Sequence, residues 1–371
     1  MNTSIRLGLV GPLPPPAGGM ANQTRELGDL LKTQGLHVRV VRTNEPVRPA
    51  WVSSLRGVRG IFRLVPYLVR LGANLRKCDV LHIMANSGWA WHLFAAPAIV
   101  IGRTRGIPIV VHYHGGLARE FLRKSTRSVL FTLRRASAVV VPSRFLQEVF
   151  SEFGIHAEII PNIVDLDKFH ADPDARFEGM HVVVARNLER IYGIDVAIRA
   201  AKILHSEFPN FVLSIAGTGP ERAPLEQLAN QLGLGSVVRF TGALQSEEIA
   251  ALYRQADVML NPSRADNAPT AIIEAAASGL PVVSTRVGGV PYLVEHGRSA
   301  WLVPSEDPQT MATGIKRVFE DSALKRTLRE NGLALARSCS WEVVRSQWLN
   351  LYQRIVEQRA PGRDSAVHLE K

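Results

Sequence analysis

Two carboxylates, Asp266 and Glu274, lie on either side of a predicted helix start. Pro269 suits the first helical position because its missing N–H has no partner there. Good helix formers fill Ala271–Ala277, and Gly279 ends the helix. The unpaired N–H groups at such a start attract an anion, above all a phosphate. From the start to Glu274 the helix advances about 7.5 Å, roughly the span from a diphosphate to the ribose of one nucleotide.

This spacing assigns a role to each group. An ionised carboxylate accepts hydrogen bonds from both hydroxyls of a diol. We therefore expect Asp266 to hold a hexose and Glu274 to hold a ribose. The expected diphosphate contacts are the residues at the helix start: Asn267, Ala268, Pro269 and Thr270. The alternative is a solvated Asp in a polar loop and a surface Glu, and the spacing alone leaves both interpretations open.

The run DNAPTAIIEAAASGLPVVSTRVGGVPYLVEHG, residues 266–297, resembles a known family. Asp266-x7-Glu274 is similar to the E-x7-E signature of the retaining family-4 glycosyltransferases of GT-B fold. The resemblance implies that Asp266 contacts the transferred sugar as a catalytic residue and that Glu274 contacts the ribose of the donor. Asp is one methylene shorter than the Glu that the family carries at the first position.

The resemblance implies a retaining hexosyl transfer from a nucleotide diphosphate sugar to an acceptor, which we expect to serve cell-surface or exopolysaccharide assembly. The expected acceptor is a glycan or a polyprenyl-linked sugar, and the lipid-linked class is suggested by the basic, amphipathic first half of the chain. The sugar nucleotide is then a co-substrate, and no cofactor is expected. A nucleotide-sugar 2-epimerase of the same fold is the alternative enzyme. A non-catalytic binding module that has kept the fold is a third interpretation.

Three glycine-containing loops at predicted strand ends match the family. Gly18 and Gly19 follow the first strand, where glycine lets backbone approach a ligand closely. His114 ends another strand, and we expect its imidazole to face the cleft and to bond a hydroxyl or share a proton. Gly217 and Gly219 belong to a G-x-G-P turn that the family places beside the nucleotide. Each loop alone is also explained by an ordinary turn or a packed His.

The segment ARNLERIYG, residues 185–193, departs from the family's G-R-L-x-x-x-K-G pattern for the diphosphate. Asn187 replaces the Arg and Tyr192 replaces the Lys. Arg186 and Arg190 are neighbours that we expect to substitute, since guanidinium pairs well with phosphate. The alternative interpretation is that both arginines are simply exposed to solvent. No Asp-x-Asp pair lies at a strand end, so we expect no metal site and a metal-independent reaction.

Strand and helix patterns alternate along the chain. Short apolar strands of this kind indicate buried parallel sheets. The fold class is therefore α/β, and with the resemblance it is GT-B, with two doubly wound Rossmann-like domains whose parallel sheets face each other across a cleft. The expected strands are residues 5–10, 38–41, 79–84, 108–113, 138–141 and 158–160, then 181–185, 211–216, 237–241, 257–260, 282–285 and 300–303.

These patterns divide the chain into two domains and a tail. Residues 1–168 form an acceptor-side domain and 169–340 a donor-binding domain, which agrees with 371 residues being too many for one ordinary core. By resemblance, the helix at about 341–358 packs back on the first domain. Residues 360–371 are expected to be disordered.

Charge is distributed unevenly between the two halves. Residues 1–170 hold 22 Lys and Arg against 10 Asp and Glu, a net of +12, while the whole chain carries +11. This favours an anionic partner for the first domain. The segment 48–77 combines Arg56, Arg59, Arg63 and Arg70 with apolar residues, and Trp51 lies near its start, so it is either a membrane-surface helix or an ordinary surface helix. Nucleic acid is not expected, because no binding module is recognised.

The remaining composition indicates a soluble globular protein. Cys78 and Cys339 form no framework of disulfides or metal ligands, which fits a reducing cytoplasm. No signal peptide and no apolar segment long enough to span a bilayer are recognised. We therefore expect a cytoplasmic protein that associates peripherally with the inner face of the membrane.

Overall fold

The computed structural model describes residues 5–15, 18–45, 58–172 and 179–358. The expected disordered tail at 360–371 lies outside these residues. So do Trp51 and Arg56 of the predicted basic helix, and the side chain of Arg59.

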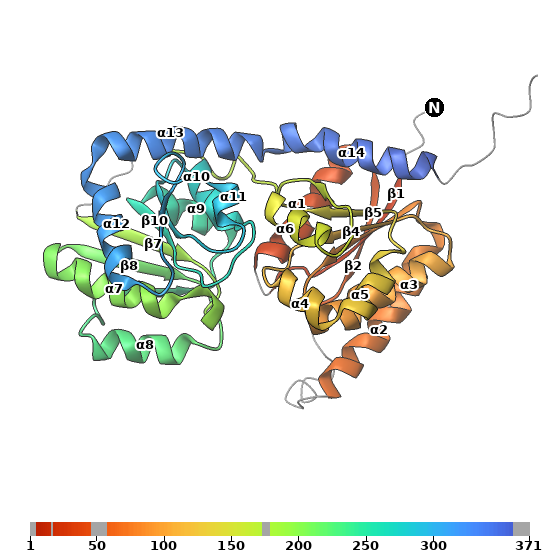
Figure 1. The fold of residues 1–371 in the computed structure, drawn as a ribbon, viewed down its shortest axis with the longest axis horizontal. Helices are drawn as coiled ribbons and strands as arrows, with labels where there is room; N and C mark the ends of the chain where they lie inside the picture. The colour runs from red at the N-terminus through yellow and green to blue at the C-terminus, as the bar shows by residue number, and fades with distance from the viewer. Residues whose placement is uncertain (1–4, 16–17, 46–57, 173–178, 359–371) are drawn as a thin grey trace, which may run out of the picture.

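Two six-stranded parallel sheets, one in each half of the chain, form the framework (Figure 1). The first sheet has the order β2-β1-β3-β4-β5-β6, and the second has the order β12-β11-β10-β7-β8-β9. All twelve predicted strands are present, each within one residue of the expected ends. The predicted α/β class with two parallel sheets is therefore confirmed.

The strands are short and largely apolar because helices cover both faces of each sheet. All six residues of β3 are buried, for example. The strands are β1 (Arg6–Gly11), β2 (His37–Arg42), β3 (Val80–Ala85), β4 (Ile109–Tyr113), β5 (Ala138–Val141), β6 (Glu158–Ile159), β7 (Met180–Ala185), β8 (Phe211–Ala216), β9 (Val238–Gly242), β10 (Val258–Asn261), β11 (Val282–Thr285) and β12 (Trp301–Val303).

Helices surround the sheets in both domains (Figure 1). The first domain contains α1 (Gly19–Thr33), α2 (Val58–Asn74), η2 (Leu75–Lys77), η3 (Trp91–Ala95), α3 (Ala96–Thr104), α4 (Ala118–Lys124), α5 (Thr126–Leu133) and α6 (Arg144–Ser151). The second contains η4 (Arg190–Tyr192), α7 (Ile194–Glu207), α8 (Arg222–Gln231), α9 (Ser246–Arg254), α10 (Thr270–Ala277), α11 (Val290–Leu293), α12 (Pro308–Glu320) and α13 (Ser322–Ser338). Among the described residues, no helix is both long enough and apolar enough to cross a bilayer.

The last helix, α14 (Trp341–Glu357), leaves the second domain and lies along the first one (Figure 1). Trp348 and Tyr352 are fully buried against a core that includes Leu7 and Val110 of the first sheet. Tyr352 also donates or accepts a 2.7 Å hydrogen bond with Nδ1 of His82, which fixes the helix on the sheet. The chain thus crosses the domain boundary twice, once before β7 and once before α14.

Candidate active site

Helix α10 begins one residue later than the sequence predicts. Pro269 has φ −66° and ψ 115°, so it is extended and precedes the helix, and Thr270 is the first helical residue. Proline's fixed φ suits both positions, and the extended ψ of Pro269 makes it the residue before the helix. Ile272 and Ile273 are buried, which anchors the helix in the second domain. Its amino end faces the first domain, because a Cβ at Gly19 of α1 would lie 3.5 Å from Oγ1 of Thr270.

A cavity of about 120 Å³ lies at this amino end, between the two domains. Cβ atoms added at Gly18 and Gly19 would lie 3.8 Å from Nδ2 of Asn187 and 3.5 Å from Oγ1 of Thr270. The amino ends of α1 and α10 therefore open into the same cavity, and both carry partial positive charge. The lining residues that the sequence singled out are Gly18, Gly19, Arg186, Asn187, Tyr192, Gly217, Thr270 and Glu274.

Glu274 stands at the junction of this cavity with a second one of about 460 Å³. Burial raises the pKa of Glu274 to about 7, against the attraction of Arg186 and Lys168. Glu26 of α1 lines the second cavity, and burial, then the charges of Glu274 and Asp165, raise its pKa to about 8. Two carboxyl groups thus meet across the domain boundary. No motif in the sequence marks Glu26.

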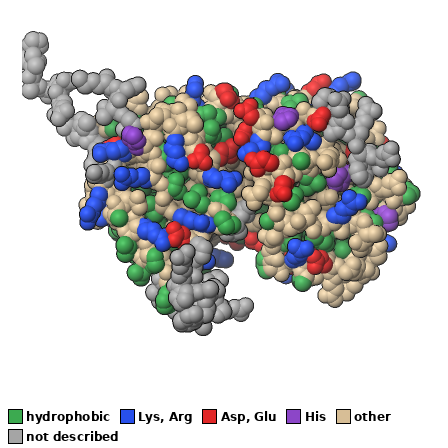
Figure 2. Space-filling view, turned by 180° about the vertical axis from the view of Figure 1, so that it is seen from behind, with side chains coloured by type: hydrophobic (Ala, Val, Ile, Leu, Met, Phe, Trp, Pro, Cys, Tyr) green, Lys and Arg blue, Asp and Glu red, His purple; other side chains and the backbone are tan. Residues whose placement is uncertain are grey.

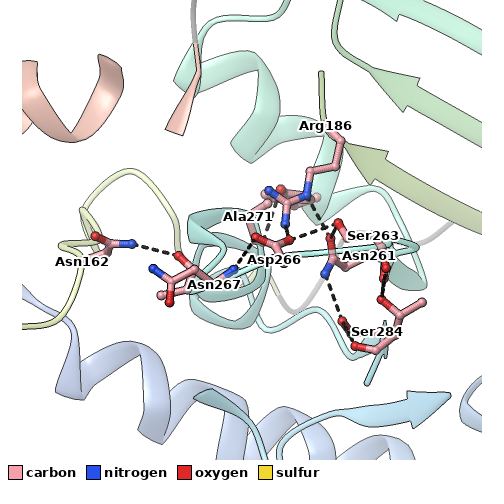
Figure 3. Close-up of polar contacts among 11 residues, drawn as sticks. Asn162, Arg186, Asn261, Ser263, Asp266, Asn267, Ala271 and Ser284 are labelled. Carbon is pink, nitrogen blue, oxygen red and sulfur yellow. Dashed lines mark hydrogen bonds and ion pairs between the residues drawn. The ribbon is translucent and has the colours of Figure 1, made fainter. Parts of the chain in front are cut away.

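Asp266 is held inside the second domain (Figure 3). Its Oδ2 accepts hydrogen bonds from Nη2 of Arg186 and, at 3.0 Å, from Oγ of Ser263, and its Oδ1 accepts one from the N–H of Asn267 at 3.0 Å. Nε of Arg186 donates to Asn261 at 2.9 Å. Arg186 lines the cavity and Asp266 does not. The guanidinium of Arg186 therefore pairs with the carboxylate that the sequence assigns to the sugar.

The turn at Gly288 and Gly289 supports the Asp266 loop. Gly288 has φ +50°, and a Cβ there would lie 2.1 Å from the carbonyl oxygen of Asp266. The N–H of Gly289 donates to that same oxygen at 3.0 Å. Only glycine fits both the conformation and the close approach. The two glycines that the sequence marks as a turn therefore fix the loop of the first acid.

Asn267 and Ala268 contact the first domain and do not line the cavity. The side-chain oxygen of Asn267 accepts a 2.6 Å hydrogen bond from Ser143, and the carbonyl of Ala268 accepts a 2.8 Å bond from Asn162. The N–H of Asn267 donates to Oδ1 of Asp266, so its contact with a diphosphate stays a prediction. Sequence reasoning missed Ser143 and Asn162. The position of Ser143 at the start of α6 was readable as a helix cap, but its partner in the other domain was not.

His114 follows β4 and lies in the loop that faces Asp266, since a Cβ at Gly116 would lie 3.8 Å from the Cα of Asp266. The ring centroid of His114 is 4.0 Å from that of His112. Burial lowers the pKa of His114 to about 4, so the imidazole is neutral at pH 7. Its Nε2 is buried and has no hydrogen-bond partner among the described residues. The ring is partly exposed beside His112, and its lowered pKa is against proton exchange near neutral pH, whereas its hydrogen bond to a hydroxyl stays a prediction.

Arg190 and Gly219 do not line the cavity. Arg190 is exposed in η4, and its carbonyl accepts a 2.6 Å bond from Arg264. A Cβ at Gly219 would lie 2.3 Å from the carbonyl oxygen of Leu188, so this glycine serves close backbone packing. Of the two arginines predicted to replace the missing cations, only Arg186 faces the cavity. It lies over the ring of Tyr192, 5.1 Å from its centroid.

Two sequence models of known families match adjacent parts of the chain. Residues 17–168 match the model described as Glycosyltransferase Family 4, and residues 168–334 match the model described as Glycosyl transferases group 1. Together they extend from the loop after β1 to α13 and so include every residue of the cavity.

Curated proteins of this kind are similar over different lengths. The GDP-mannose-dependent alpha-(1-6)-phosphatidylinositol monomannoside mannosyltransferase of Mycolicibacterium smegmatis is 28% identical over 95% of this chain and 97% of its own. A D-inositol 3-phosphate glycosyltransferase of Corynebacterium urealyticum is 33% identical over 45% of this chain. The matched part spans only 41% of that relative's length.

Solved structures show the same fold at low identity. Sucrose-phosphate synthase of Thermosynechococcus elongatus superposes with a TM-score of 0.77 at 22% identity, covering 95% of this chain and all of that one. Anabaena HepE in complex with UDP and glucose superposes with a TM-score of 0.72 at 22% identity, covering 94% of this chain and 99% of its own. With two family models matched end to end and the two parallel sheets of that architecture, the chain belongs to the family-4, group 1 glycosyltransferases of GT-B fold.

Proposed function

We propose that this protein transfers a hexosyl group, with retention of configuration, from a nucleoside diphosphate sugar to a glycan or lipid-linked acceptor in cell-surface or exopolysaccharide assembly. The observation that carries the proposal is the cavity where the amino ends of α1 and α10 meet beside Arg186 and Glu274. Such a cavity suits a diphosphate, because helix amino ends and a guanidinium both stabilise phosphate charge.

Each donor group has a place in this arrangement. The diphosphate lies against Thr270, the Gly18–Gly19 backbone and Arg186, and the ionised Glu274 accepts hydrogen bonds from the ribose. When the diphosphate binds, Arg186 exchanges Asp266 for a phosphate, and Asp266 becomes free to contact the hexose. The neutral imidazole of His114 bonds a sugar hydroxyl, which would satisfy its buried Nε2.

The nucleotides named for similar proteins support the donor class. The mycobacterial relative is named as GDP-mannose-dependent, and the Anabaena structures contain UDP, UDP with glucose, or UDP-glucose. All are nucleoside diphosphates or their sugars, which is the class that the cavity suits. The bases differ, so the proposal concerns the class and not one base.

We propose further that the leaving diphosphate is stabilised without a metal ion. Two helix amino ends and Arg186 face the position where its charge develops, and preorganised dipoles of this kind are effective in a closed site. Turnover that is unchanged in EDTA supports this. Turnover that is abolished by EDTA and restored by Mg²⁺ or Mn²⁺ contradicts it.

The acceptor is proposed to lie at the cytoplasmic leaflet of a membrane. Helix α2 exposes Phe62, Val65 and Val69, with 45%, 57% and 68% of each residue accessible. Arg70 lies on the same helix, and apolar and basic side chains together favour an anionic surface. Co-sedimentation with phosphatidylglycerol vesicles at physiological salt tests this. A protein that stays in the supernatant contradicts it.

Thermal shift with a panel of nucleoside diphosphates tests the donor site. A ligand at a hundred times its Kd stabilises the folded protein by about 2.7 kcal/mol, which raises Tm. We expect that gain to shrink in Arg186→Gln, since a hydrogen bond to a charged group contributes about 1.5–3 kcal/mol, and to persist in Arg190→Gln, an exposed neighbour. The ligand-induced shift is compared rather than the absolute Tm, because Arg186→Gln also leaves Asp266 unpaired.

Product analysis then identifies the reaction. Sugar transferred to an acceptor with the anomeric configuration of the donor supports the proposal. Conversion of the nucleotide sugar without acceptor indicates the epimerase, and nucleotide binding with neither reaction indicates a binding module. Either result contradicts the transferase.

A further inference from the structure

A second cationic pocket, separate from the donor cavity, lies between β2 and α2 of the first domain. Its volume is about 310 Å³. Three of its described lining residues are arginines: Arg42, Arg63 and Arg70. Phe62 and Tyr67 supply aromatic walls, and Tyr67 is almost fully buried. A concave site lined by guanidinium groups and aromatic walls suits phosphate recognition.

The described lining residues of this pocket include more basic than acidic side chains. Glu45 is the one carboxylate among its described lining residues, and it forms an ion pair with Arg70. The three arginines and one glutamate leave a formal charge of +2. Figure 2 shows that charged side chains over the first domain, on the left in this view, are mainly basic. The basic lining residues of the pocket therefore attract an anion.

Arg42 is held in position by its own domain. Its Nη2 donates to the carbonyls of Leu13 and Pro15 at 3.0 and 2.5 Å, and its Nε donates to Asn44 at 2.9 Å. Asn44 in turn binds the same loop through the N–H and the carbonyl of Leu13. These bonds use one edge of the guanidinium and fix its direction. A guanidinium that is already fixed loses little freedom when it binds a phosphate.

The pocket lies on the edge of the first sheet that faces the second domain. The carboxyl ends of the parallel strands all lie at this edge. Ser143 after β5 and the His114 loop after β4 both contact the Asp266 loop there. β2 ends at the same edge, beside β1. The loop that Arg42 holds leads from β1 to Gly18, which lines the donor cavity. An anion bound to Arg42 is therefore next to the donor loop but outside the donor cavity.

We propose that the pocket lined by Arg42, Arg63 and Arg70 binds a phosphate group of the acceptor. This inference rests on the proposed transferase function, because it names the acceptor by the charge that the pocket selects. The phosphate belongs either to a soluble sugar phosphate or to a lipid headgroup, and both present the same oxygens to the arginines. The aromatic walls pack against the carbon atoms next to the phosphate.

Binding of inorganic phosphate to the full chain, with the donor cavity filled by a nucleoside diphosphate, is the first test. We expect Arg70→Gln and Arg63→Gln to weaken phosphate binding about tenfold. Glu45→Gln should tighten it about fivefold, because it removes the competing carboxylate from Arg70. Arg76→Gln, an exposed arginine outside the pocket, is the matched control and should change nothing.

The tighter phosphate binding expected of Glu45→Gln cannot be explained by a damaged fold, because such damage would weaken binding. Equal phosphate affinity in all four variants, or no saturable phosphate binding, overturns the proposal. The donor variant Arg186→Gln separates the two hypotheses: it should weaken nucleotide binding and leave phosphate binding at this pocket intact. Failure of nucleotide binding with intact phosphate binding would therefore count against the proposed function alone.

Kinetics with two acceptor types then identify the source of the phosphate. If it is soluble, a hexose phosphate serves as acceptor, and its KM rises about tenfold in Arg70→Gln while kcat changes little. If it is a lipid, the same change appears with phosphatidylcholine vesicles that contain a hexose linked through diphosphate to undecaprenol, whose sugar hydroxyl is the acceptor, and not with vesicles that lack it. Acceptor KM values that are equal in wild type and Arg70→Gln for both types contradict the assignment.

Discussion

Glu274 is expected to lower the free energy of unfolding of the ligand-free protein and to tighten its binding of the donor. Its carboxyl group is enclosed at the domain boundary, and burial raises its pKa from 4.5 to about 7. A shift of this size corresponds to about 3 kcal/mol between the protonated and ionised forms. The raised value means that the fold disfavours the ionised form. The destabilisation is therefore absent well below pH 4.5, grows between pH 4.5 and 7, and is complete above pH 7.

Glu274→Gln keeps the shape and removes the charge. At pH 8 we expect the variant to exceed wild type in free energy of unfolding by about 3 kcal/mol, and at pH 5 by about 1 kcal/mol or less. Urea unfolding at the two pH values measures both differences. Glu330→Gln, an exposed glutamate on α13, is the control and should show no such pH dependence.

Donor binding should change in the opposite direction. An ionised carboxylate accepts stronger hydrogen bonds from ribose than an amide oxygen does, so Glu274→Gln should raise the Kd of a nucleoside diphosphate about 10- to 100-fold. Groups that are needed for binding often lower the stability of the folded protein. The reasoning is refuted if Glu274→Gln is no more stable than wild type at pH 8, or if the difference is the same at both pH values.

Two further substitutions test how the site is supported. Gly217 has φ +153°, and a Cβ there would lie 1.9 Å from the carbonyl oxygen of Arg186. Gly217→Ala should therefore lower the free energy of unfolding, measured by urea titration, by more than about 2 kcal/mol and should also reduce nucleotide binding. The control is Gly233→Ala, at φ +72° in open space, which should lower the free energy of unfolding by about 1 kcal/mol in the same titration. Trp348 is 1% exposed and stacks on Tyr352. Trp348→Ala should therefore lower the free energy of unfolding by about 3–5 kcal/mol in the same titration. A decrease below about 1 kcal/mol would mean that Trp348 does not anchor α14 on the first domain.

The strands were predictable because their signal is local. Each is a short apolar run between helix and turn signals, and a buried parallel strand needs little else. The position of Glu274 was predictable for a similar reason, since a helix period and a proline fix where its side chain starts. These features depend on neighbours within a few residues.

The surroundings of Asp266 were not predictable, because they depend on residues that are far apart in the sequence. Arg186 reaches it from a separation of 80 residues, and Ser143 reaches Asn267 from a separation of 124. His114 shows the same limit: a strand end followed by glycines indicates an exposed ring, but His112 packs against it. Spacing along the chain therefore identifies candidate groups, while long-range packing decides which of their atoms are already occupied.

The loss of two cations from the family's pattern has a physical counterpart in this fold. Asn187 and Tyr192 line the cavity where an Arg and a Lys are expected, and the single guanidinium of Arg186 enters from the adjacent position over the ring of Tyr192. A cation that is paired with Asp266 before the donor arrives contributes less net attraction than a free one, since its charge is already compensated. The helix ends of α1 and α10 therefore supply more of the attraction for the diphosphate in our proposal. In the proposed mechanism this pairing also links phosphate binding to sugar binding, because Arg186 would leave Asp266 when it binds the phosphate and Asp266 would then contact the sugar.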